Sequence, residues 1–247
     1  TAPLLTTVKG QKALLLATEK SIHAFDLEGR KIQQWQSFEV EGSITTSILA
    51  QEKNYIIGTS TGTIYWINDN GQKIDQIKRN NTAVKALSLF DNYKIVALDS
   101  KGGLNLISNT AESKYWTVTT DTAKYYGDFI NVTSSNIPNI AVISGNYLKV
   151  FSINDTLKTD FQHHFTKPIT DEMQFFESTT RKNAYDIGVA SKATNLLYLF
   201  KEDGQLVEGF PTEGQPLFYY GKIDYNSATY LLCMRRDHKL YAFRQKK

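Results

Sequence analysis

Residues 54–77 read NYIIGTSTGTIYWINDNGQKIDQI, and this stretch decides the fold. A short apolar run at 55–57 leads into a small polar turn, and an alternating run then begins at Ile64. A second turn ends on Asn70 and Gly71, a pair that supplies the positive φ of a tight hairpin. The stretch therefore predicts short β-strands joined by tight turns, with side chains alternating between two faces.

The same arrangement recurs along the chain. Six residues open an alternating run, and we call them the anchors: Ile22, Ile64, Leu104, Leu148, Leu197 and Leu240. Successive anchors are 42, 40, 44, 49 and 43 residues apart. A period in the low forties with several short strands per unit is typical of β-propeller blades. We therefore expect an all-β chain that forms a β-propeller of six four-stranded blades, with a partial seven- or eight-bladed ring as the alternative.

Each blade is expected to run from an inner to an outer strand. Inner strands are expected at 4–8, 44–49, 84–90, 127–132, 173–177 and 217–223. Outer strands are expected at 31–35, 73–77, 114–118, 158–161 and 206–210. The sixth unit ends near Phe243 without an outer strand, which leaves an unpaired sheet edge. We expect residues 1–247 to be one propeller domain of a longer protein, because the sequence starts at Thr1 rather than Met.

Two units carry a family resemblance. Residues 22–26 (IHAFD), followed by Gly29 and Trp35, and residues 64–68 (IYWIN), followed by Gly71, resemble the repeats of quinoprotein-type β-propellers. Residues 202–211 (EDGQLVEGFP) resemble blades of exported bacterial propellers of unassigned function. The resemblance implies a binding or scaffolding role and an extracytoplasmic location, in the periplasm or at the cell surface. It does not imply a bound quinone, because the dense set of polar and metal ligands that a quinone needs is missing from the sequence.

Composition excludes several kinds of partner. The 247 residues carry 28 Lys or Arg and 25 Asp or Glu, a net charge of +3, which is too weak for a nucleic-acid-binding surface. No stretch approaches the 18 apolar residues of a membrane helix, so we expect no membrane insertion. The single cysteine, Cys233, sits in an apolar run and is expected to be a buried, inert thiol.

The sequence gives no sign of catalysis. It contains no Gly-rich phosphate loop, nucleophile elbow or zinc helix. Inner strands offer only scattered carboxylates, namely Asp128, Glu177 and Asp224. His163 and His164 are adjacent, so on a strand they point to opposite faces and are poorly placed to hold one metal ion. We therefore expect no enzyme activity, no catalytic residue, no cofactor and no metal site.

One face of the propeller is the candidate binding site. Loops between second and third strands and loops between blades share this face, and they carry aromatic and basic residues of the kinds favoured in binding hot spots. These residues are Trp116, Tyr125, Tyr126, His163, His164, Lys101, Arg235 and Arg236. Packing between blades is the alternative for the tryptophan and the tyrosines. We expect a non-catalytic propeller that binds a protein partner; the alternative is a carbohydrate-binding or carbohydrate-active propeller with a site at the channel mouth.

Overall fold

A computed structural model describes residues 3–78, 81–90, 94–108, 113–119, 125–130, 139–153, 156–223 and 228–245. Within these ranges the backbone forms strands and turns, and it forms no helix. None of the described segments is therefore a helix that could cross a membrane. Contacts divide the chain into two compact units, Thr1–Thr120 and Asp121–Lys247, and each is described by itself.

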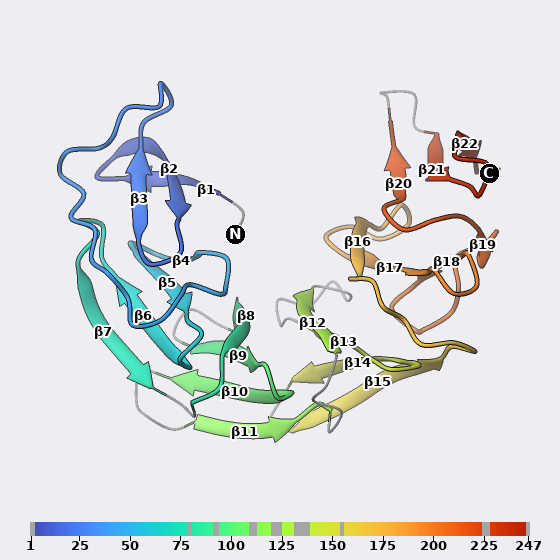
Figure 1. Cartoon of the computed structure of the whole chain (residues 1–247), viewed down its shortest axis with the longest axis horizontal. Helices are drawn as coiled ribbons and strands as arrows, with labels where there is room; N and C mark the ends of the chain where they lie inside the picture. The colour runs from blue at the N-terminus through green and yellow to red at the C-terminus, as the bar shows by residue number, and fades with distance from the viewer. Residues whose placement is uncertain are drawn as a thin grey trace. The chain divides into compact units, whose positions relative to one another are not determined.

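The first unit holds sheets 1 to 3 (Figure 1). Sheet 1 contains β1 (Leu4–Val8), β2 (Gln11–Ala17) and β3 (Ile22–Phe25). Sheet 2 contains β4 (Leu49–Gln51), β5 (Asn54–Gly58), β6 (Thr63–Ile67) and β7 (Lys73–Lys78). Sheet 3 contains β8 (Val84–Leu89), β9 (Lys94–Asp99), β10 (Gly103–Ser108) and β11 (Ser113–Thr117).

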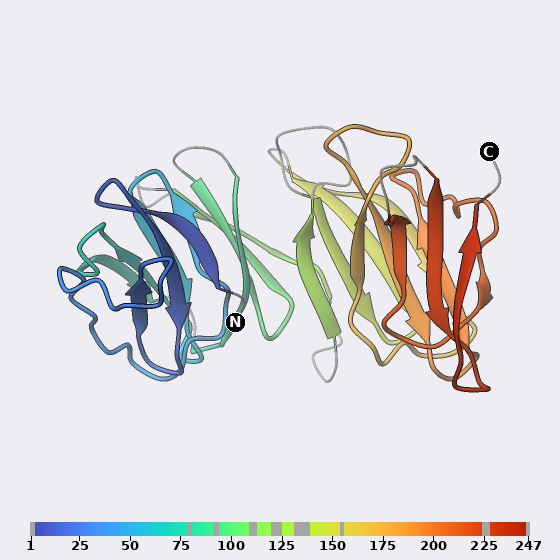
Figure 2. The same ribbon diagram turned by 90° about the horizontal axis from the view of Figure 1, so that it is seen from above.

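The second unit holds sheets 4 to 6. Sheet 4 contains β12 (Tyr125–Ile130), β13 (Asn139–Ser144), β14 (Tyr147–Ile153) and β15 (Leu157–His164). Sheet 5 contains β16 (Gln174–Glu177), β17 (Tyr185–Ser191), β18 (Leu196–Phe200) and β19 (Thr212–Glu213). Sheet 6 contains β20 (Tyr219–Lys222), β21 (Thr229–Met234) and β22 (Leu240–Arg244), which lie side by side in Figure 2.

Strands in every sheet are antiparallel and follow chain order. This is the order that short turns impose, because antiparallel neighbours can be joined by tight hairpins. Apolar side chains on both faces then pack sheet against sheet within each unit. One cluster joins sheets 1 and 2, another joins sheets 2 and 3, and two more join sheets 4 to 5 and 5 to 6.

Two predicted outer strands are wrong. Residues 31–35 and 206–210 each make one bridge to the third strand, Phe25 to Lys31 and Phe200 to Leu206, and then turn away. In sheet 1 the turn brings Trp35 back over the sheet, where its Nε1 donates a 2.8 Å hydrogen bond to the Ile22 carbonyl. The indole also packs against Gly71 of sheet 2. Docking the large ring between two sheets therefore replaces strand pairing at this position.

Three predicted inner strands begin or end elsewhere. The strand expected at 44–49 is observed as β4, which begins only at Leu49. Ile44 makes an isolated bridge to Thr59 instead. The strand expected at 127–132 starts earlier, at Tyr125, and residues 131–132 lie outside the described ranges. The strand expected at 217–223 starts later, because Leu217 has a φ of 63° that an extended strand does not accommodate. The remaining expected strands match observed ones within a few residues.

Candidate functional site

The most distinctive exposed cluster is at the turn between β21 and β22. Tyr241 and Phe243 lie two residues apart on β22, so their rings share one face and stack 5.8 Å apart with an angle of 8°. The guanidinium of Arg235 covers both rings, 5.1 Å from the Tyr241 centroid and 4.6 Å from that of Phe243. This is the geometry of a cation–π contact.

A hydrogen bond holds the stack in position. The Tyr241 hydroxyl donates to Asp237 Oδ2 at 2.7 Å, and the backbone amide of Lys239 donates to Asp237 Oδ1 at 3.2 Å. The hydroxyl bond, more than any other contact, lowers the pKa of the Asp237 carboxyl. The turn residues therefore fix the tyrosine ring beneath the arginine.

Arg235 has unused hydrogen-bonding capacity. Its Nε is buried and has no hydrogen-bond partner among the described residues. An unpaired buried donor costs about 1–3 kcal/mol. A partner would reach the terminal nitrogens of this guanidinium rather than its buried Nε, and Arg is suited to binding carboxylates through its N–H groups.

Neighbouring residues extend this cluster. Arg236 reaches the turn of sheet 5, where its Nη2 and Nε lie 2.7 and 3.0 Å from the side-chain amide of Asn195. Met234 and Leu240 are paired across the sheet and are 40% and 72% exposed, but they lie on the opposite face of sheet 6 from Tyr241 and Phe243. We call the cluster on the Tyr241 face the Arg235 surface; its members are Arg235, Arg236, Tyr241 and Phe243.

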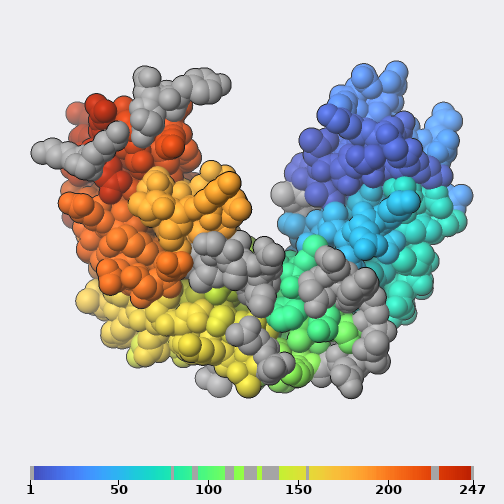
Figure 3. Space-filling view, turned by 180° about the vertical axis from the view of Figure 1, so that it is seen from behind, coloured from blue at the N-terminus to red at the C-terminus, as the bar shows by residue number. Residues whose placement is uncertain are grey.

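A pocket of about 300 Å³ lies at the other end of β22. Its apolar lining includes Phe210, Tyr220, Leu231 and Phe243, and its polar lining includes Glu208, Arg244 and Gln245. Sheets 5 and 6 both contribute to it. In the space-filling view the last strands, coloured red, lie beside the orange residues of sheet 5 (Figure 3).

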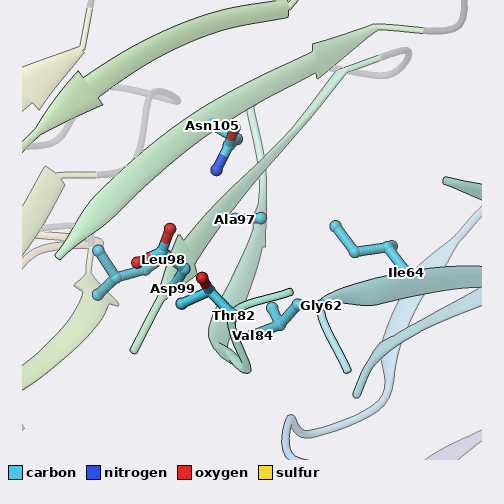
Figure 4. Close-up of a pocket in the computed structure, with 8 residues that line it drawn as sticks. All are labelled: Gly62, Ile64, Thr82, Val84, Ala97, Leu98, Asp99 and Asn105. Carbon is cyan, nitrogen blue, oxygen red and sulfur yellow. The ribbon is translucent and has the colours of Figure 1, made fainter. Parts of the chain in front are cut away.

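A second cavity lies between sheets 2 and 3 and is much smaller. It has a volume of about 10 Å³, close to the minimum that holds one water molecule. Thr82, Asp99 and Asn105 contribute polar atoms to its lining (Figure 4). Asp99 Oδ1 already accepts 2.8 Å hydrogen bonds from the backbone amides of Lys101 and Gly103. This cavity suits a structural water rather than a ligand.

The residues of the predicted face fall in both units. In the first unit, Lys101 is an exposed residue of the β9–β10 turn, and Trp116 is half-buried on β11 opposite Leu104. In the second unit, Arg235 and Arg236 lie in one turn and belong to the Arg235 surface. The backbones of Tyr125 and Tyr126 lie in β12, but their side chains are outside the described part of the structure.

The two predicted histidines have different surroundings. His164 is exposed and lies against the ring of Tyr147, at 4.8 Å. The ring of His163 belongs to an aromatic cluster between sheets 4 and 5, with centroids 4.7 Å from Phe165, 4.8 Å from Phe200 and 5.8 Å from Tyr198. Burial, with a smaller contribution from His164, lowers the pKa of His163.

This burial predicts a pH effect on stability. The folded state disfavours the protonated form of His163. The stabilising contacts of the neutral imidazole are therefore fully present above the ordinary histidine pKa, and this stability is lost as pH falls below it. Replacing His163 by phenylalanine should therefore reduce the loss of stability between about pH 7 and pH 5. Urea denaturation at several pH values measures this loss, with His164→Phe as the matched control. Equal pH dependence in the parent and in His163→Phe would contradict the burial of this ring.

The carboxylates expected on the inner strands are not brought together by one strand. Glu177 lies on β16, Asp128 lies on β12, and Asp224 is outside the described residues. Asp128 is exposed, but partial desolvation of its carboxyl, with a smaller contribution from Glu172, raises its pKa. The described residues contain no group of three or more His, Cys, Asp or Glu that could hold a metal ion.

Sequence reasoning misses the partners of Arg235. Tyr241 and Phe243 fit the strand pattern of every blade, so the pattern assigns them to packing within a blade. No signal in the sequence sets these two residues apart, because the same alternating pattern occurs in the other five units. The pocket beside Phe210 could not be found from sequence, since it depends on the turn that replaces the expected strand at 206–210.

Comparisons with known proteins show the fold. No family model matches the chain, and no curated protein matches it. Two crystal structures of BBS1N in complex with ARL6DN are similar to it. The mercury-soaked one has 18% identity and a TM-score of 0.63, covering 95% of this chain and 75% of that chain. The lead-soaked one has 16% identity and a TM-score of 0.66, covering 100% and 78%.

A computationally designed protein, Ika8, is also similar, with 14% identity, a TM-score of 0.62 and coverage of 99% of this chain and 70% of that chain. At such low identities the likeness speaks only for the fold. Together with the six antiparallel sheets, it confirms the predicted class, an all-β propeller.

Proposed function

We propose that this chain is a non-catalytic β-propeller that binds protein partners through the Arg235 surface. The observation that carries this proposal is the guanidinium of Arg235, held over the rings of Tyr241 and Phe243 at 5.1 and 4.6 Å from their centroids. Arginine and tyrosine are enriched in binding hot spots, and a pre-positioned side chain loses little entropy when a partner binds. A partner with a carboxylate or carbonyl oxygen above an apolar patch fits this surface.

The fold comparison supports a protein partner over other ligands. The similar structures of BBS1N were determined in complex with another protein, ARL6DN. The proposal extends that kind of role to this chain, without extending the identity of the partner. Membership of the quinoprotein-type propellers and a location in the bacterial cell envelope are further proposals. The first rests on the sequence resemblance of the first two units, and the second rests mainly on that of residues 202–211. Fractionation of cells expressing the full-length protein tests the location.

Replacing Arg235 by alanine tests the proposal. Loss of a hot-spot arginine typically costs about 2 kcal/mol or more, so the affinity for a captured partner should fall about 30-fold. Stability should change by only about 0.5–1 kcal/mol, the size of an exposed cation–π contact. The measurement is affinity capture from cells, followed by titration of the purified partner against the parent and the variant.

A matched control distinguishes an effect of the Arg235 surface from a general effect of removing one surface charge. Arg30→Ala removes an arginine from another turn, where Arg30 pairs with Asp26 at 2.7 Å. The control should leave partner affinity unchanged. Equal affinity of parent and Arg235→Ala, or equal weakening by both alanine variants, would show that the Arg235 surface is not the contact.

Carbohydrate binding or hydrolysis is the second candidate, and one observation favours it. Desolvation, with a smaller contribution from the charge of Glu172, raises the pKa of Asp128, and a carboxyl with a raised pKa is the kind of group that acts as a general acid on a glycosidic bond. Glycan-array binding and hydrolysis assays, with Asp128→Asn as the variant, test it. Sugar-dependent activity that disappears in the variant would favour this candidate over the protein-binding one.

A further inference from the structure

Leu217 lies in the loop between β19 and β20, where it combines high exposure with a strained backbone. Its side chain is 86% exposed, more than that of any other large apolar residue among those described. Its φ is 63°, in the left-handed region that a bulky side chain rarely adopts. The other non-glycine residues with positive φ in the described chain are all polar or charged. Backbone strain of this kind occurs mainly at functional sites, where surrounding contacts hold it in place.

Two hydrogen bonds fix the chain just before Leu217. The backbone amide of Gly214 donates to the Asn195 carbonyl at 3.0 Å, and the amide of Gln215 donates to the Met234 carbonyl at 2.8 Å. These bonds attach the loop both to the turn of sheet 5 and to the end of β21. The loop is therefore held on two sides before it reaches Leu217.

The residue after Leu217 is fixed as well. The Gln174 side chain on β16 bonds both backbone groups of Phe218: the Phe218 amide donates to Oε1 at 3.2 Å, and Nε2 donates to the Phe218 carbonyl at 3.1 Å. The Phe218 ring is 3% exposed, and a Cβ at Gly188 would lie only 2.8 Å from it. Leu217 therefore joins two fixed points, and its side chain is presented with little conformational freedom left to lose on binding.

The position of Leu217 is also exposed in sheets that have a following neighbour. Its equivalents are Ser47 in sheet 2 and Glu172 in sheet 5, because each is three residues before an inner-strand residue that faces the preceding sheet. Both are exposed, although sheet 3 packs on sheet 2 and sheet 6 packs on sheet 5. Sheet 6 therefore carries leucine at a position where two other sheets carry an exposed polar residue.

The surroundings of Leu217 are basic. The register of β20 and β21 places Leu217 level with Met234, where the turn between β21 and β22 begins. Residues 234–239 (MRRDHK) contain three Lys or Arg and one Asp, and Glu213 at the end of β19 offsets only one of the remaining positive charges. A surface that meets Leu217 therefore gains from carrying carboxylates.

We propose that Leu217 inserts into an apolar pocket of a partner protein, and that carboxylates beside that pocket face the basic turn at 234–239. The inference rests on the proposed protein-binding function and names the chemistry of the partner surface. Burial of an exposed leucine stabilises the complex and contributes nothing to the free protein. A twofold dimer would bring two copies of the basic turn together, which disfavours a second copy as the partner.

A soluble host molecule tests the chemistry of this site directly. The probe is carboxymethyl-β-cyclodextrin, which has an apolar cavity with carboxylates at its rim, and the comparison hosts are the neutral and the amine-substituted cyclodextrins. Isotope-labelled leucine methyl groups report binding by NMR, and the Leu217 signal is the one that Leu217→Asn removes. Leu217 should bind the carboxylate host about 3-fold more tightly than the neutral one, as expected from one exposed ion pair.

Leu27 is the matched control for the host titration. It is 60% exposed in a turn of sheet 1, between Asp26 and Glu28, which pair with Arg30 and leave one negative charge. Leu27 should therefore prefer the amine-substituted host. The inference is wrong if Leu217 binds none of the hosts, or if Leu217 and Leu27 show the same preference.

Substitution distinguishes an inserted side chain from one that supports the fold. Asn tolerates the left-handed conformation, so Leu217→Asn should raise the urea midpoint measured by circular dichroism. The same variant should bind the captured partner about 30-fold more weakly, because it loses the burial of a leucine side chain. Leu217→Met should retain most of the affinity, since methionine has a similar apolar volume. Leu27→Asn should leave the affinity unchanged. A lower urea midpoint in Leu217→Asn would show that Leu217 supports the fold, and would overturn the inference.

Two further measurements identify the wrong kind of partner. If the parent sediments with vesicles of phosphatidylcholine and phosphatidylserine and Leu217→Asn does not, then Leu217 contacts a membrane and the inference is wrong. Sedimentation that shows dimers of the parent, and monomers of Leu217→Asn, would assign Leu217 to a second copy and also overturn it.

The two proposals can fail separately. Weaker partner binding in Arg235→Ala, with full affinity in Leu217→Asn, would keep the Arg235 surface and remove the insertion of Leu217. Weaker binding in Leu217→Asn, with full affinity in Arg235→Ala, would keep the insertion and remove the Arg235 surface. Full affinity in both variants would show that both proposals are wrong.

Discussion

Replacing Arg181 by methionine is expected to lower the free energy of unfolding by about 3–5 kcal/mol near neutral pH, since it leaves a buried charge without its partner. Arg181 Nη2 lies 2.7 Å from Asp186 Oδ1, and Nη1 lies 2.6 Å from Glu202 Oε2. The side chains of Arg181 and Asp186 are 17% and 4% exposed. Methionine fills similar space but offers no hydrogen bond, so the Asp186 carboxylate loses its cationic partner.

The loss of unfolding free energy in Arg181→Met should become smaller as pH falls. Burial raises the pKa of Asp186, and the hydrogen bond and charge of Arg181 act against that rise. A carboxyl whose folded pKa lies above its unfolded value destabilises the fold at high pH, and the penalty disappears as pH falls through the folded pKa. Without Arg181 the pKa of Asp186 should rise further. The variant should therefore recover part of its stability between neutral pH and the ordinary Asp pKa, near 4.

Urea denaturation followed by far-UV circular dichroism measures both effects. Tryptophan fluorescence is unsuitable, because Trp35, Trp66 and Trp116 all lie in the first unit and Arg181 lies in the second. Adding Asp186→Asn to Arg181→Met should restore much of the loss and remove the extra pH dependence.

Lys192→Met is the matched control for Arg181→Met. It breaks an exposed pair with Asp171, whose atoms are 2.9 Å apart and whose lysine side chain is 65% exposed, and should cost at most about 1 kcal/mol. Equal losses in Arg181→Met and Lys192→Met would contradict the buried pair.

Much of the fold could be predicted because the repeating pattern consists of side chains that pack against near neighbours. Apolar residues with period two fix the register of a strand, and Asx-Gly pairs fix its turns. The expected strands at 4–8, 73–77, 114–118 and 158–161 therefore match β1, β7, β11 and β15 closely. Those expected at 31–35 and 206–210 failed, since alternation alone cannot show that Trp35 folds back to bond the Ile22 carbonyl.

The candidate site was less predictable than the fold. Residue type alone points to Arg235 and Arg236, but their role in binding depends on side chains that are close in the folded structure and not adjacent in sequence. Leu240 has the same sequence context as five buried anchors, four of which pack against the following sheet. No described sheet follows sheet 6, and Leu240 is 72% exposed. His163 was expected on an exposed face, and its ring instead contacts three aromatic rings between sheets 4 and 5. The position of that face as a whole remains a prediction.

Replacing Gly71 by alanine is expected to destabilise the first unit by about 3 kcal/mol, and replacing Gly29 by alanine by only about 1 kcal/mol. Both glycines lie in the turn after a third strand, and both have a φ of 81°. A Cβ at Gly71 would lie 2.7 Å from the Trp35 ring, whereas a Cβ at Gly29 meets nothing within 4 Å. Both substitutions therefore place alanine at a positive φ, but only Gly71→Ala also brings a methyl group against the docked Trp35 ring.

The difference between the two variants measures how strongly sheets 1 and 2 depend on the Trp35 contact. All three tryptophans lie in the first unit, so fluorescence-detected urea denaturation reports on the unit that carries both glycines. In a Trp35→Leu background the two alanine substitutions should cost the same, because the shorter leucine side chain leaves room for the methyl group that Gly71→Ala adds. If Gly71→Ala and Gly29→Ala cost the same with Trp35 intact, the indole does not dock there, and the turn at 32–35 has another cause.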